Sequence, residues 1–155
     1  MSDLEKLEFF PKWRQAVKDF LAEFAYGDIV THDWLADHFG MPTLDEDATL
    51  TATDFRERQF AWLGSIEAFK TELLNEHQVC LQSIFGRGYR WAFPAEQTHI
   101  AMESFTKDAR RAFRTVDKKL KNIRVAELSS EQRRENLDAV TKVSMLRGMS
   151  IKNLK

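Results

Sequence analysis

The chain has a single cysteine, no long apolar run and no recognisable leader, and each absence excludes a class of protein. One cysteine, Cys80, rules out an internal disulfide framework and fits a reducing compartment. No apolar run approaches the ~18 residues that a membrane-spanning helix needs. The acidic beginning MSDLEKLEFF lacks the basic and apolar regions of a secretory signal peptide. We therefore expect a cytoplasmic protein.

Motifs of catalysis and cofactor binding are missing as well. There is no Gly-rich phosphate loop, no GxSxG and no CxxC, and the histidines do not stand at metal-ligand spacing with Cys80. Asp33, Asp37 and His38 share one short predicted helix, where an exposed pair of like charges is the commoner arrangement. We therefore expect no enzymatic activity, no metal and no cofactor.

What the chain does contain is apolar and charged residues in globular proportions. Its 155 residues are 43% apolar and 30% charged, and they include 12 Phe and 4 Trp. This length and composition fit one domain, or one domain with an appendage, around a single modest core.

The charges are divided unevenly along the chain. Residues 1–76 contain 7 Lys and Arg against 16 Asp and Glu, whereas residues 77–155 contain 16 against 8. Eight of the cations fall within residues 107–124, beside only Asp108 and Asp117. Such a division suggests a polyanion or an acidic partner for one half. The alternative is that the two halves face each other, within one chain or across a dimer.

Apolar periodicity predicts helices in the first half of the chain. One helix is expected from about residue 11 to 25, and a short one follows Thr31 as N-cap and ends at Gly40. Residues 29 and 30 are expected to form a short strand or an extended link. After the acidic loop TLDEDATLTA, Thr53 and Asp54 are expected to begin a helix that reaches about residue 76. Its apolar stripe comprises Phe55, Phe60, Leu63, Ile66, Phe69, Leu73 and Leu74.

A β-hairpin is predicted next, and two helices after it. Residues 79–84 and 89–93 alternate with period two around Gly86-Arg87-Gly88, and Pro94 ends the second strand. Two apolar stripes between residues 96 and 147 then predict a helical hairpin, with the second helix ending at Gly148. The expected fold is mainly α with one β-hairpin: residues 1–94 as one domain, and 95–155 as a basic helical hairpin that is a candidate dimerisation element.

The order helix, short helix, longer helix, β-hairpin resembles a winged helix-turn-helix domain. The stretch IEAFKTELLNEHQVCLQSIFGRGYRW looks like the end of the DNA-binding domain of response regulators of the OmpR/PhoB class. The family's wing ends in RGxGYR, and this chain keeps Gly86, Gly88, Tyr89 and Arg90. It departs from the pattern at Phe85, where the family has arginine, and carries Arg87 between the glycines. The whole chain is also similar in character to a small phage or mobile-element protein.

The resemblance implies that the longer helix enters the major groove of duplex DNA, while the wing contacts the backbone or the minor groove. Four residues of that helix and two of the wing are then DNA-binding candidates: Arg56, Arg58, Ser65, Lys70, Arg87 and Arg90. The basic helix is not part of that family, and its charge alone adds four candidates for contacts with phosphates: Arg110, Arg114, Lys118 and Lys121. The last four share one helix face. Tyr89 and Trp91 are expected to support the hairpin rather than to stack on bases.

Two functions follow from these observations. The first is a regulator that binds double-stranded DNA as a dimer. The second is a protein-binding module whose acidic N-terminal half docks on the basic surface of a nucleic-acid enzyme and inhibits or recruits it. The acids of the predicted recognition helix count against simple DNA binding, because neutralisation of phosphates supplies much of the affinity for DNA, and they fit the second function about as well.

Overall fold

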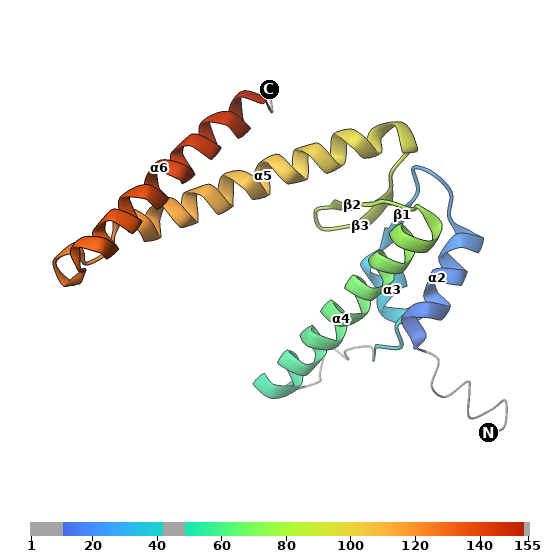
Figure 1. Cartoon of the computed structure of the whole chain (residues 1–155). Coiled ribbons are helices and arrows are strands. Elements are labelled where there is room, and N and C mark those ends of the chain that lie inside the picture. The colour runs from blue at the N-terminus through green and yellow to red at the C-terminus, as the bar shows by residue number, and fades with distance from the viewer. Residues whose placement is uncertain (1–10, 42–48, 154–155) are drawn as a thin grey trace, which may run out of the picture. The chain divides into compact units, whose positions relative to one another are not determined.

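The computed structural model describes residues 11–41 and 49–153, and the side chains of this range up to residue 150 (Figure 1). The protein is mainly helical with a small antiparallel sheet. It divides into two compact units, residues 1–97 and 98–155. Most of the predicted loop TLDEDATLTA lies outside the described residues.

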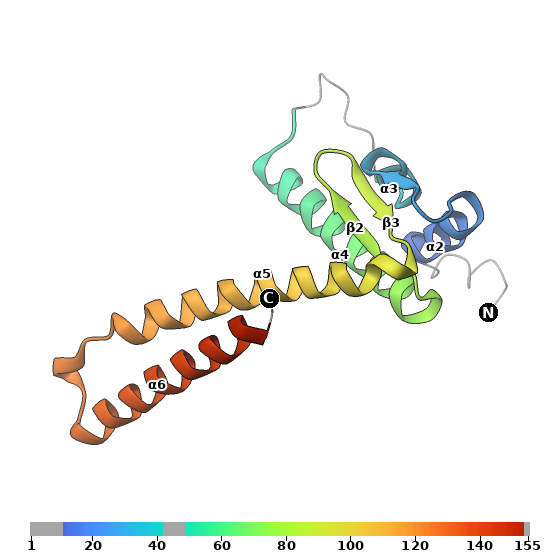
Figure 2. The ribbon, with the colours of Figure 1, turned by 90° about the horizontal axis from the view of Figure 1, so that it is seen from above.

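The first unit contains helices and strands in an interleaved order. Along the chain these are α2 (Lys12–Glu23), β1 (Ile29–Thr31), α3 (His32–His38), α4 (Ala52–His77), β2 (Leu81–Ile84) and β3 (Gly88–Trp91). The predicted hairpin is confirmed as β2 and β3, which run side by side in Figure 2. Residues 29 and 30 form a strand rather than a link. Strand β1 pairs with β3, so that the order across the sheet is β1-β3-β2.

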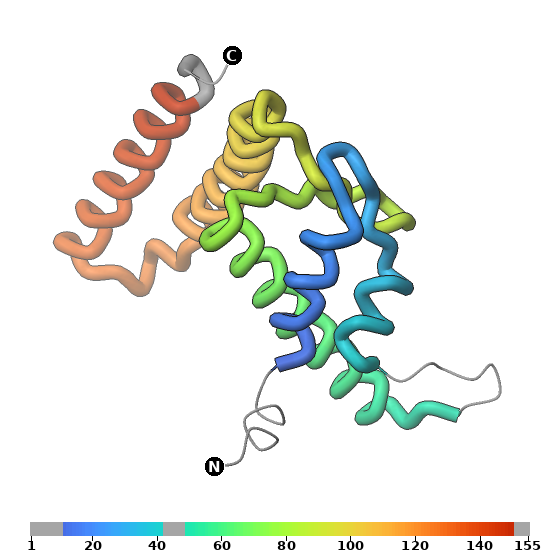
Figure 3. The backbone as a smooth tube through the Cα atoms, turned by 90° about the vertical axis from the view of Figure 1, so that its right-hand side faces the viewer, coloured from blue at the N-terminus to red at the C-terminus, as the bar shows by residue number. Residues whose placement is uncertain are grey.

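The core of this unit lies where α2, α3, α4 and the sheet meet. Figure 3 shows α2 running beside both α3 and α4. Phe20 of α2 is fully buried, with its ring centroid 5.8 Å from that of Phe69 in α4 and 5.2 Å from that of Trp91 in β3. Leu35 of α3 and Val30 of β1 are also fully buried. Burial of these large apolar side chains contributes roughly 1.5–3 kcal/mol for each.

Local side-chain hydrogen bonds set where α3 and α4 begin. The hydroxyl of Thr31 accepts a hydrogen bond from the N–H of Trp34 at 3.1 Å, as expected of the N-cap of α3. The prediction for α4 was wrong by two residues, because Thr51 and not Thr53 is its N-cap. Thr51 and Asp54 form a capping box, in which each side chain accepts from the other's N–H. That reciprocal pair satisfies two N–H groups, which a cap at Thr53 would not do.

The second unit is a helical hairpin, as predicted. Helix α5 (Pro94–Lys121) begins in the first unit, and a short 3-10 turn, η1 (Val125–Glu127), leads to α6 (Ser130–Asn153). The amide of Asn136 donates to the carbonyl of Leu120, and Asp117 pairs with Arg147 at 3.6 Å, so the helices are antiparallel. The predicted end of α6 at Gly148 was wrong. A glycine inside a helix costs only about 1 kcal/mol relative to alanine, and the helix continues through it.

Candidate nucleic-acid interface

The tip of the β2–β3 hairpin is a tight turn that depends on Gly86. The N–H of Arg87 donates to the carbonyl of Ile84 at 3.1 Å, which closes a four-residue turn. Gly86 is the third residue of this turn and has φ +72°. A positive φ at that position is the pattern of a type II turn, and glycine adopts it without strain. Apart from its two chain neighbours, nothing lies within 4 Å of the place where a β-carbon of Gly86 would sit, so the turn is open on that side.

Gly88 is required for a different reason, because only a residue without a side chain lets β1 approach β3 at this position. Its φ is +153°, and a β-carbon there would overlap the carbonyl oxygen of Val30 and lie 2.9 Å from the Cα of Thr31. Thr31 and Gly88 are paired in the sheet register. The two glycines around Arg87 are therefore explained by the fold alone.

The side chains at the tip are not explained by the fold. Phe85 is completely exposed, and Arg87 is exposed beside it. The backbone that carries Arg87 is nevertheless fixed at both ends, because its N–H donates to Ile84 and its carbonyl accepts from the N–H of His32 at 3.3 Å. The tip therefore presents a phenyl ring and a guanidinium on a fixed backbone.

Arg90, the other wing candidate, is engaged within the first unit. Its guanidinium donates to both carboxylate oxygens of Glu96, at 2.7 and 3.3 Å, and lies over the ring of Phe93. These hydrogen bonds lower the pKa of Glu96 and raise the pKa of Arg90. Arg90 thereby ties β3 to the first turn of α5, and this role was missed because spacing alone does not identify its partner.

The aromatic residues of β3 support the hairpin, as expected. Trp91 and Tyr89 both pack against the core. The ammonium of Lys70 also lies over the ring of Tyr89, 5.2 Å from its centre. Lys70 is paired in addition with Glu67 at 3.3 Å. Of the α4 candidates, Lys70 is therefore already engaged with protein groups.

Two of the remaining α4 candidates, Arg56 and Arg58, lie toward the beginning of the helix, and Ser65 lies at its middle. Arg56 is exposed, and Ser65 is half-buried in a cleft beside Phe39. Arg58 lines both this cleft and a second one of about 470 Å³, where His32 and Trp62 also contribute. This second cleft lies between α3 and the first half of α4.

The outward side of α4 carries apolar residues among charged ones, and the predicted single stripe was wrong. Only Ile66, Phe69 and Leu73 of that stripe are buried. The helix has more apolar residues than one side of it can bury, and four remain exposed: Phe55, Phe60, Leu63 and Leu74. A prediction that counts only i, i+3 and i+4 repeats cannot separate two apolar sides of one helix.

The cations of α5 are exposed and only partly paired. Arg110, Arg114 and Lys118 have no ion pair with any residue that the structure describes. Lys121 is paired with Asp117 at 3.0 Å, and Asp117 also bridges to Arg147. Among the four α5 residues that are predicted to contact DNA, Lys121 is thus the one whose charge is already paired with a carboxylate.

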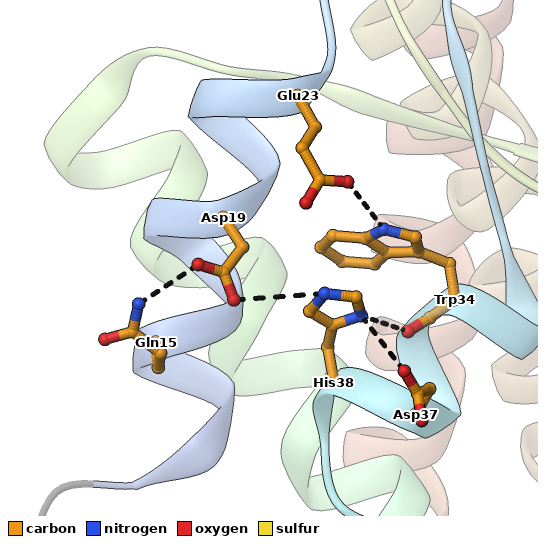
Figure 4. Close-up of polar contacts among 6 residues, drawn as sticks. All are labelled: Gln15, Asp19, Glu23, Trp34, Asp37 and His38. Carbon is orange, nitrogen blue, oxygen red and sulfur yellow. Dashed lines mark hydrogen bonds and ion pairs between the residues drawn. The ribbon is translucent and has the colours of Figure 1, made fainter.

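A polar cluster between α2 and α3 was missed by sequence analysis (Figure 4). The ring of His38 stacks on Trp34 at 3.6 Å, its Nδ1 donates to the Trp34 carbonyl, and its Nε2 lies 3.9 Å from Asp19. The indole N–H of Trp34 donates to Glu23 at 3.0 Å. The cluster fixes α3 against α2, and its members lie too far apart in the chain for a local motif to reveal them.

Other site types find little support in the described residues. No group of three or more His, Cys, Asp or Glu side chains there is arranged to hold a metal ion. None of the helices within the described ranges has the length and apolar character needed to cross a membrane. Burial raises the pKa of the Cys80 thiol, which makes it a poorer nucleophile.

Comparison with known proteins adds no assignment. The chain matches no known protein family, no characterised protein and no solved structure. Its function has to be argued from the geometry described above.

Proposed function

We propose that this protein is a cytoplasmic regulator that binds double-stranded DNA through a winged helix-turn-helix domain. The observation that carries the proposal is the order of elements, α2-β1-α3-α4-β2-β3, together with the sheet order β1-β3-β2. In this arrangement a helix follows a short helix and is succeeded by a glycine-tipped hairpin. This is the order expected of a recognition helix followed by its wing.

Three groups of cations would contact the duplex, all of them exposed except the half-buried Arg58. Arg56 and Arg58 belong to the first half of α4, Arg87 to the wing, and Arg110, Arg114 and Lys118 to α5. Arginine is suited to the first two groups because its planar guanidinium binds a guanine edge or a phosphate through two hydrogen bonds. The α5 cations are suited to phosphates, which supply affinity without sequence preference.

The first test is a variant of the wing. Arg87→Ala should weaken binding to duplex DNA by about 1–3 kcal/mol if the guanidinium contacts a base edge. The unfolding temperature should hardly change, because only the backbone of Arg87 is bonded within the fold. Arg90→Gln is the matched control, and it should lower the unfolding temperature because it breaks the pair with Glu96. Fluorescence anisotropy and thermal melts measure both quantities, and unchanged affinity in Arg87→Ala would exclude the wing contact.

The second test addresses α5. The double variant Arg114→Gln, Lys118→Gln should bind all duplexes more weakly and should reduce the slope of log K against log salt by about 1.8, because each phosphate contact contributes about 0.9. If the helix instead faces acidic protein surface, the same variant will lose stability or change oligomeric size while its salt slope stays at the wild-type value.

A protein-binding module is the second candidate, and the outward side of α4 favours it. Phe60 and Leu63 are more than half exposed there, and Glu67 lies between them and the exposed Leu74. An apolar surface with acids suits a basic, partly apolar protein surface better than a DNA groove. Absence of any duplex shift at low salt, with folded wild-type protein, would favour this candidate over DNA binding.

A further inference from the structure

The wing tip carries an aromatic side chain that the fold does not need. Phe85 is the most exposed of the large apolar side chains in the described part of the chain, with a relative exposure of 102%. It occupies the second position of the turn that Gly86 shapes, a position that accepts most residue types. The register of the hairpin is fixed elsewhere, by the pairing of Gly88 with both Thr31 and Ile84. A polar residue would serve the turn equally well.

The tip is also thin and fixed in position. Gly86 adds no side chain beside the phenyl ring, and apart from its two chain neighbours no atom lies within 4 Å of the place where its β-carbon would sit. The backbone hydrogen bonds of Arg87 to Ile84 and from His32 hold the turn against the sheet and the start of α3. A fixed tip loses little conformational freedom on binding, and this favours insertion into a narrow site.

We propose that the tip is a minor-groove wedge, in which Phe85 inserts between two base pairs while Arg87 lies in the groove. This inference rests on the proposed DNA binding and adds that the DNA is kinked. The minor groove is about 6 Å wide, so it requires a thin element. A narrow A·T-rich minor groove attracts arginine, and pyrimidine–purine steps unstack most readily. An apolar wedge at such a step bends the duplex by about 20–90°.

The charge of Arg87, next to Phe85, indicates whether the tip binds DNA or a protein pocket. A phenyl ring alone would fit either site. Arg87 next to it has no ion pair with a described residue, so its guanidinium would be carried into the same site as the ring. A groove rich in negative potential stabilises that charge, whereas an apolar protein pocket would have to desolvate it.

The experiment uses the full chain and a duplex of about 30 base pairs with an A·T-rich centre and one TA step. The adenine of that step is replaced by 2-aminopurine, whose fluorescence rises when it unstacks, and the ends carry a donor and an acceptor dye. At saturating protein we expect the 2-aminopurine signal to rise and the end-to-end distance to shorten. Phe85→Ala should lose both changes, whereas Phe85→Leu should keep part of each because leucine is also an apolar wedge.

Leu74→Ala is the matched control, since it removes another exposed apolar side chain from the same unit, near the C-terminal end of α4, and should retain both signals at saturation. The unfolding temperature of Phe85→Ala should equal that of the wild type, because the ring makes no contact within the fold. The wedge would be overturned if the wild type bound the duplex saturably without unstacking the 2-aminopurine, or if Phe85→Ala bent the duplex as much as the wild type does. Either result would leave the proposed DNA binding intact. Absence of duplex binding at low salt would overturn both.

Discussion

At the scale of single residues, the two glycines of the β2–β3 hairpin show that identical residues serve different physical needs. Gly86 needs a positive φ but has empty space around it. Gly88 has a positive φ and also the carbonyl of Val30 where a side chain would begin. Only the second glycine is required by a contact between segments that are distant in the sequence.

This difference predicts unequal costs for the same substitution. Gly86→Ala should lower the free energy of unfolding by about 1–2 kcal/mol, the cost of left-handed backbone in a residue with a β-carbon. Gly88→Ala should lower it by about 3 kcal/mol or more, since β1 must also move away from β3. Urea denaturation of the two variants measures both values. Equal losses would contradict the close approach of β1 at this position.

At the scale of elements, the pair Arg90–Glu96 joins the last strand of the first unit to the beginning of α5. Glu96 lies in the first turn of the helix, where the helix dipole also favours a negative charge. The hydrogen bonds from Arg90 lower the pKa of Glu96 from its ordinary value of 4.5. The carboxyl group of Glu96 therefore loses its proton more readily in the folded state than in the unfolded chain.

The lowered pKa predicts a pH-dependent contribution to stability. Above pH 4.5 the contribution of the Glu96 carboxylate should be complete, and it should be lost as the pH falls through the lowered pKa of the folded state. The difference in unfolding temperature between wild type and Glu96→Gln should thus be largest near neutral pH and shrink in acid. Glu103→Gln is the control on the same helix, and its exposed pair with His99 should contribute little at any pH. A difference that grows in acid would contradict the ion pair.

At the scale of the whole molecule, the helical hairpin buries little apolar surface among its described residues. None of the described side chains from residue 98 to 150 is fully buried. Large apolar side chains remain exposed on both helices, among them Phe105 on α5 and Met145, Leu146 and Met149 on α6. A pair of helices of this kind normally acquires its core by association. A second copy of the chain is the partner that would suit the proposed DNA binding, if the site has two-fold symmetry.

Association of this kind predicts a dimer whose unfolding temperature rises with protein concentration. The double variant Leu146→Asp, Met149→Asp should give monomers with a lower unfolding temperature, because two charges would enter the apolar contact. Ser144→Asp adds a charge at an exposed polar position of α6 and should leave the dimer intact. Sedimentation equilibrium and concentration-dependent melts measure these effects. A wild-type monomer at every concentration would rule out this role for the hairpin.

Signals between residues that are close in the chain were sufficient to predict most helices and strands of this protein. Apolar periodicity, the Thr31 cap, Gly40 and the glycines around Arg87 predicted the helices and the β2–β3 hairpin, because these signals act between residues that are close in the chain. The small errors at Thr51 and Gly148 arose where two local signals competed within one or two turns of a helix.

Only the tertiary structure decided which distant groups meet. The pairing of β1 with β3, the bond between Arg90 and Glu96 and the contact of His38 with Asp19 depend on how the helices pack around Phe20. Packing also decided that Phe60 and Leu63 face outward although their spacing resembles that of core residues. A helix of 26 residues has more than one apolar side, and the sequence does not state which side the sheet and α2 will cover.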